Sequence, residues 1–213
     1  MKKGITIFCF LLSFLFIAPS IAQDTKEIKK EIQQKALKEA RKEAKTLSKE
    51  GFKVSPGQKP MDKQIEDAWM TRYQKGADGY PAYFVADARS TGESHSVAKL
   101  QANEVAKINL VGQIGTEVAG LVETNLANSQ LSSDDAVSIT ETVGTFKSII
   151  GSKLGRTLIL FEASKSLKDN TEVFITIAYS YEKAIAMSKD VIRQELKEKT
   201  KLNAEALDKI LDF

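Results

Sequence analysis

The chain has 213 residues, a net charge of +3 at pH 7, one cysteine and one histidine. One cysteine cannot form a disulfide framework, and one histidine argues against a zinc site, which needs several histidine or cysteine ligands. The charge is small and forms no basic block, so the composition gives no indication of nucleic-acid binding.

The first 22 residues have the pattern of a secretory signal peptide. Lys2 and Lys3 precede an apolar run over 4–17, and small residues lead up to Ala22. The run is shorter than the roughly 20 residues of a membrane-spanning helix, so we expect cleavage after Ala22 rather than a retained anchor. Cleavage would remove two lysines and Cys9, leaving a net charge near +1 and no thiol for a disulfide or a lipid. The sequence therefore predicts a periplasmic or outer-membrane-associated protein.

Residues 23–50 predict a charged amphipathic helix. Apolar side chains recur at spacings of four and three and form a thin stripe: Ile28, Ile32, Ala36, Ala40, Ala44 and Leu47. Such a basic helix could lie on anionic lipid, but a stripe that is half alanine buries too little apolar area to hold a membrane. We expect it to dock on its own domain or on a partner helix, with peripheral membrane contact as the less favoured alternative.

Residues 51–60 hold two prolines and two glycines, which predicts a linker or an extended segment on the domain surface. The next helix begins at Met61, where Met61, Ile65, Trp69 and Tyr73 are spaced by four residues. We interpret this stripe as packing. The alternative is an aromatic surface for a sugar or a peptide.

Residues 80–90 alternate like a strand, with Phe84, Ala86 and Ala88 on one face. The small alanines indicate that another element lies close above that face. A helix over 96–127 is the expected one, because it carries its own ridge of alanines and further apolar positions: Ala98, Ala102, Val105, Ala106, Ile108, Val111, Val118 and Val122. Glycines at 112, 115 and 120 cost roughly 1 kcal/mol each relative to alanine in a helix, which indicates a kink or very close packing.

The remaining segments complete an α+β pattern. Ser132 begins a further helix, the runs 156–165 and 172–180 form a hairpin, and helices follow from Glu182 and near Asn203. We predict a single α+β domain over 61–213, in which a small mixed or antiparallel three-stranded sheet is packed by long helices in the order β-α-α-β-β-α. The charged helix at 23–50 is additional to it.

The sequence GESHS at 92–96 joins a predicted strand to a predicted helix, where hydrolases place the nucleophile of a G-x-S-x-G elbow. Here the last residue is serine, and neighbouring helical side chains point about 100° apart, so His95 would rarely face Ser94. We expect Ser94 or Ser96 to cap the helix and Gly92 to let the chain turn. No catalytic, cofactor or metal residue is predicted. Glu162, in a predicted strand, is the one acidic residue to test for burial, although we expect an exposed strand face.

Residues 83–181, about half of the chain, resemble the twenty-kilodalton surface lipoprotein family of Gram-negative bacteria, which includes the flagellar accessory lipoprotein P. The similar features are a strand that ends in Ala88-Arg-Ser-Thr-Gly92, an alanine-rich helix over 98–106, and a hairpin whose second strand contains Ile177-Ala-Tyr179. The resemblance implies a compact helix-and-sheet domain with an envelope or surface-structure role and no known catalytic residues. The chain departs from the family in having no lipid-bearing cysteine after Ala22.

These observations predict an exported, non-catalytic accessory protein that contacts an envelope or surface-structure protein, or a second copy of itself, and no nucleic acid or cofactor. The charged helix and the Trp69/Tyr73 stripe are the candidate contact surfaces. The alternative is a periplasmic binding module for an envelope glycan or a small molecule, in which Trp69, Tyr73, Tyr80 and Tyr83 line one groove. A serine hydrolase using Ser94 and His95 is the third, least favoured class.

Overall fold

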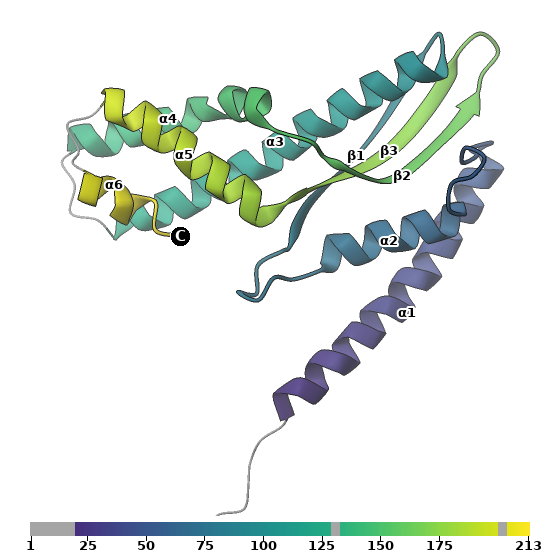
Figure 1. Ribbon diagram of the computed structural model, residues 1–213, viewed down its shortest axis with the longest axis horizontal. Helices are drawn as coiled ribbons and strands as arrows, with labels where there is room; N and C mark the ends of the chain where they lie inside the picture. The colour runs from purple at the N-terminus through teal and green to yellow at the C-terminus, as the bar shows by residue number, and fades with distance from the viewer. Residues whose placement is uncertain (1–19, 129–132, 200–203) are drawn as a thin grey trace, which may run out of the picture.

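The computed structural model describes residues 20–128, 133–199 and 204–213 (Figure 1). Residues 1–19 of the predicted signal peptide, and the predicted helix starts at Ser132 and Asn203, lie outside the described residues. The α+β class is confirmed. The elements are α1 (Ser20–Lys49), α2 (Met61–Tyr73), β1 (Tyr83–Gly92), α3 (His95–Ala127), α4 (Ser133–Lys153), β2 (Leu158–Ser166), β3 (Thr171–Ser180), α5 (Tyr181–Lys199) and α6 (Ala204–Ile210).

The three strands form one antiparallel sheet in the order β1-β3-β2. Successive side chains on a strand point to opposite faces, so the register decides which helix each residue meets. One face carries Phe84, Ala86, Ala88, Val173, Ile175 and Ile177 toward α3. The other face carries Phe161, Ala163 and Phe174 toward α1 and α2.

The main core lies between the sheet and α3, as the alanine pattern predicts. Ala98, Ala102 and Ala106 are completely buried and share this core with Ala86 and Ala88. Small side chains on both surfaces let the helix lie close to the strands. At about 1.5 Å per residue, the 33 residues of α3 span roughly 50 Å, so its second half runs past the sheet and packs against α4, α5 and α6 (Figure 1).

Two of the three α3 glycines differ from expectation, whereas Gly115 is buried. A methyl group built at Gly112 or Gly120 would meet nothing within 4 Å, so close packing explains neither residue, and α3 continues through both. Gly92, by contrast, is needed for a close approach. A Cβ there would lie 2.7 Å from the backbone nitrogen of Ala98. Because Gly92 is not among the described glycines with positive φ, its role is contact with α3 rather than a special turn.

α1 docks on its own chain, which confirms that interpretation of the charged helix. Ala36, Ala40, Ala44 and Leu47 are buried, and α1 packs along α2 on the face of the sheet opposite α3 (Figure 1). Arg89 of β1 strengthens the junction: its guanidinium lies 3.1 Å from the carboxylate of Glu50 and 4.5 Å from the ring centre of Phe174. The N-terminal half of α1 extends beyond α2.

The outer edge of β2 is covered by the segment that follows α1. Lys53 exchanges two backbone hydrogen bonds with Ser164, at 2.8 and 2.9 Å, while its neighbour Phe52 is buried. Further along, the side-chain oxygen of Gln64 accepts the backbone N–H of Glu162 at 3.1 Å. Of the two alternatives for 51–60, the beginning of this segment is therefore an extended stretch held against the sheet.

The outer edge of β1 is covered by side chains of α3. The amide of Gln113 donates to the carbonyl of Val85, and the amide of Asn109 donates to the carbonyl of Asp87, both at 3.1 Å. An open strand edge is a template for pairing with another strand, so both edges of this small sheet are partly blocked. Among the described helices, none is long and apolar enough to span a membrane.

Candidate functional site

The structure resolves the GESHS segment as a helix cap. Ser94 is the N-cap of α3, and its side-chain oxygen accepts the backbone N–H of Val97 at 3.3 Å. The first N–H groups of a helix have no partner within the helix, so this bond satisfies one of them. The predicted cap is confirmed at Ser94, and the hydroxyl is turned toward the helix end.

His95 faces a carboxylate instead of a hydroxyl. Its Nε2 lies 3.5 Å from Oε1 of Glu162 on β2, and Nζ of Lys99 lies 2.7 Å from Oε2 of the same residue. The side chain of Glu162 is only 18 % exposed, so the expectation of an exposed strand face is wrong. Sequence reasoning missed this cluster because Glu162 is more than sixty residues from His95 and Lys99 in the chain.

The three residues line a hollow of about 540 Å³ at the β2 edge, together with Lys59 and Asp67. The charges there are matched within the chain, since Lys99 pairs with Glu162 and Lys59 pairs with Asp67, each at 2.7 Å. Glu162 therefore neutralises a lysine as well as facing the imidazole. The hollow presents no surplus charge, and we interpret the cluster as an ion-pair network that joins α3 to β2.

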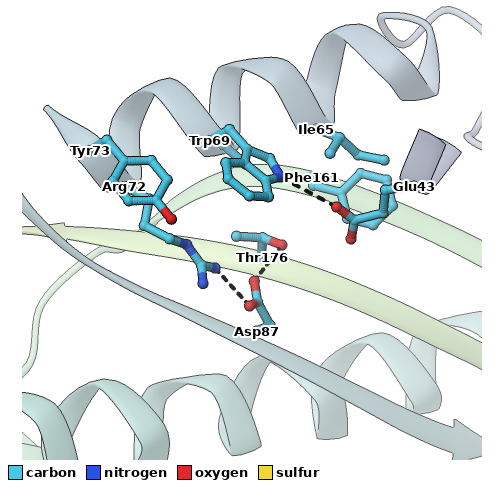
Figure 2. Close-up of a pocket in the computed structure, with 9 residues that line it drawn as sticks. Glu43, Ile65, Trp69, Arg72, Tyr73, Asp87, Phe161 and Thr176 are labelled. Carbon is cyan, nitrogen blue, oxygen red and sulfur yellow. Dashed lines mark hydrogen bonds and ion pairs between the residues drawn. The ribbon is translucent and has the colours of Figure 1, made fainter. Parts of the chain in front are cut away.

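A second cavity, of about 230 Å³, lies between α2 and the sheet (Figure 2). Its lining comes from five elements: Glu43 of α1; Ile65, Ala68, Trp69, Arg72 and Tyr73 of α2; Asp87 of β1; Phe161 of β2; and Thr176 of β3. We call it the α2 cavity. The helical spacing of α2 turns Ile65, Trp69 and Arg72 toward the sheet, and strand alternation turns Asp87 and Thr176 toward α2.

Hydrogen bonds hold the polar groups of the α2 cavity in place. Nη2 of Arg72 lies 2.6 Å from Oδ2 of Asp87, whose Oδ1 accepts the hydroxyl of Thr176 at 2.8 Å. Thr176 is buried, so Asp87 supplies the acceptor that its hydroxyl needs. At the other end, the indole N–H of Trp69 donates to Glu43 at 3.4 Å.

The four aromatic residues of the alternative hypothesis do not share one groove. Trp69 and Tyr73 line the α2 cavity with ring centres 5.5 Å apart, whereas Tyr80 stacks on Tyr181 at 5.6 Å beside a different hollow. Tyr83 lines neither hollow. The packing interpretation of the α2 stripe holds for buried Ile65 and fails for Tyr73, which is 51 % exposed.

Tyr181, the first residue of α5, contacts both the sheet and α3. Burial raises the pKa of its phenol above the ordinary value of 10.0, and the hydrogen bond that the phenol donates to Glu117 at 3.0 Å raises the pKa further. The ring of Phe84 also stacks on the ring of Tyr181, with ring centres 5.1 Å apart. The neutral phenol therefore connects the sheet to α3 through the ring contact with Phe84 and the hydrogen bond to Glu117.

The outer face of α3 carries an exposed apolar row, which we call the α3 stripe: Val97, Leu100, Val105 and Ile108. The exposed fractions of Leu100 and Ile108 are 63 % and 68 %. The sequence pattern counts Val105 and Ile108 among the apolar positions of this helix, but they lie away from the buried alanine ridge. Adjacent Glu104 and Lys107 form an ion pair at 2.7 Å.

No protein-family model, no curated protein and no solved structure matches this chain significantly. The resemblance to the surface lipoprotein family therefore stays a prediction. Within the described residues, no group of three or more His, Cys, Asp or Glu side chains is arranged to hold a metal ion.

Proposed function

We propose that the protein is an exported, non-catalytic accessory protein of the cell envelope that acts through contacts with other proteins. The observation that carries the proposal is the α3 stripe. Its two largest side chains, Leu100 and Ile108, are mostly exposed, whereas the opposite face of α3 is packed against the sheet and the other helices. Several exposed apolar side chains on one part of a helix surface are a common feature of interaction sites.

The surroundings of the α3 stripe have the composition of a contact surface. Fully burying a leucine or isoleucine side chain contributes about 1.5 to 3 kcal/mol, so a partner that covered Leu100 and Ile108 would gain several kcal/mol. The Glu104–Lys107 ion pair supplies a polar rim next to them. The predicted signal peptide and the resemblance to an envelope family support the same proposal, because both predict an exported protein.

Site-specific crosslinking in intact cells tests the proposal. A photoreactive amino acid at position 100 should capture a specific envelope protein or a second copy of the chain. The same amino acid at Lys183, an exposed position on α5, is the control and should not capture it.

The double variant Leu100→Lys/Ile108→Lys should abolish the complex that contains the captured protein. Val137→Lys is a matched control because Val137 is also an exposed apolar residue, 56 % exposed, on the different helix α4. A complex that persists in the double variant, or equal capture at positions 100 and 183, would contradict the proposal.

A further inference from the structure

We propose that the α2 cavity binds a single neutral sugar ring. This inference is independent of the α3 stripe, because the cavity lies on the opposite side of the sheet (Figures 1 and 2). It also replaces the four-aromatic groove with a site that contains only Trp69 and Tyr73 of those four aromatic residues, together with residues from α1, α2 and the three strands.

The lining matches the two kinds of surface that a sugar ring presents. Figure 2 shows Arg72 and Tyr73 at one end of the cavity, Glu43 at the other, the Trp69 indole between them, and Asp87 below the indole. A sugar has apolar C–H faces, which pack on aromatic rings, and hydroxyl groups around its rim, which both donate and accept hydrogen bonds. Carboxylates accept and a guanidinium donates, so both ends of the cavity offer partners to rim hydroxyls.

The charges of the lining select against anionic ligands. The guanidinium of Arg72 is matched by Asp87 at 2.6 Å, and Glu43 adds a further negative charge, which disfavours an anion. A neutral ligand with several hydroxyls avoids this cost.

The size and the openness of the cavity fit one ring. Its volume of about 230 Å³ is below the roughly 300 to 1,000 Å³ of sites for drug-sized molecules. Arg72 and Asp87 keep more than 40 % of their side chains exposed, so the cavity opens to solvent at that end. Buried Thr176 and Phe161 close it on the side of the sheet. The site therefore suits a terminal sugar residue, with the rest of a glycan outside.

The chain provides a built-in reporter for this site. Trp69 is the only tryptophan in the sequence, so tryptophan emission reports on the α2 cavity alone. We would titrate the full chain with glucose and N-acetylglucosamine as neutral probes. Glucuronate is the anionic probe and glucosamine is the cationic probe. Saturation-transfer NMR on the unmodified protein gives a second measurement that does not depend on any variant.

The expected result is a saturable change in emission with at least one neutral probe and weaker binding of the anionic probe glucuronate. Tyr73→Ala should weaken binding about fivefold, because it removes a stacking ring worth roughly 1 kcal/mol. Tyr80→Ala is the matched control and should keep the affinity, since Tyr80 is similarly exposed but lies outside this cavity.

Three outcomes would overturn the proposal. They are no saturable signal with any sugar by either method, tighter binding of glucuronate or glucosamine than of the neutral sugars, and equal affinities for Tyr73→Ala and the unmodified chain. Crosslinking through the α3 stripe is unaffected by these outcomes, so the two proposals fail separately.

Discussion

Asp87 joins two structural layers, because its Oδ2 lies 2.6 Å from Nη2 of Arg72 on α2 while its Oδ1 accepts the hydroxyl of Thr176 on the central strand. The two contacts differ in environment. The side chains of Arg72 and Asp87 are 43 % and 41 % exposed, whereas Thr176 is 4 % exposed. Solvent weakens the ion pair, but it does not reach the threonine.

Asp87→Ala should therefore destabilise the protein more than Arg72→Ala. Leaving the buried hydroxyl of Thr176 without an acceptor costs about 1 to 3 kcal/mol, whereas an exposed ion pair contributes about 0 to 1 kcal/mol. The double variant Asp87→Ala/Thr176→Val should recover part of the loss. Urea unfolding measures all three free energies, and a larger loss for Arg72→Ala would show that the ion pair dominates.

Gly112→Ala and Gly120→Ala should each stabilise the protein by up to about 1 kcal/mol. Both glycines lie within α3, where alanine is the better helix former, and a methyl group at either position meets open space. Gly92→Ala should have the opposite sign, because its Cβ would collide with the backbone of Ala98. Thermal melts of the three variants test this prediction. It is contradicted if the melting temperatures of all three variants shift in the same direction.

Ser94→Ala should lower the free energy of unfolding by about 1 kcal/mol, and Ser94→Asp should restore most of it, since both serine and aspartate cap helices. Ser96→Ala is the control and should change little, because Ser94 is the residue that caps α3. Denaturant unfolding gives these values. Stoichiometric labelling of Ser94 by a fluorophosphonate would instead reveal an activated hydroxyl and contradict the structural role.

The stability of the protein should fall at alkaline pH in a way that depends on Tyr181. The pKa of its phenol is raised in the folded protein above the ordinary 10.0, so the unfolded chain loses this proton first. The contribution of Tyr181 is therefore complete below pH 10 and declines as the pH rises toward the folded pKa.

Tyr181→Phe should make the dependence of unfolding free energy on pH flatter above pH 10. Tyr80→Phe alters a neighbouring, partly exposed phenol and serves as the comparison. Urea unfolding between pH 8 and pH 11 checks both variants, and an identical slope in Tyr181→Phe and the unmodified chain would show that the phenol of Tyr181 is not the group involved.

The order of helices and strands could be predicted from the sequence because each element has a clear period. Ala98, Ala102 and Ala106 predicted close packing on Ala86 and Ala88, and the structure places all five in one core. Local rules also identified the cap at Ser94. In each case, one short stretch of sequence carries the whole signal, whether a helical repeat, a strand alternation or a hydroxyl before a helix.

Other features could not be predicted, because they depend on how distant elements meet. Ile108 is apolar and lies in a helix of the right period, but it is exposed because the sheet covers only one side of α3. Glu162 is partly buried because His95 and Lys99 of α3 contact its side chain on β2. The α2 cavity likewise joins residues from five elements. Its local signs are the Trp69/Tyr73 stripe and Asp87, a charged residue in the middle of a strand.

The backbone bridge between Lys53 and Ser164 has a consequence for where the chain can be shortened. A fragment that begins at residue 61 would lose this bridge together with Phe52 and the whole of α1. It would bare the hydrogen-bonding groups of β2 next to Phe161 and Ala163, which α1 normally shields. Such a fragment is expected to aggregate through that uncovered strand. The amino-terminal helix and the segment that follows it are therefore needed to shield the sheet.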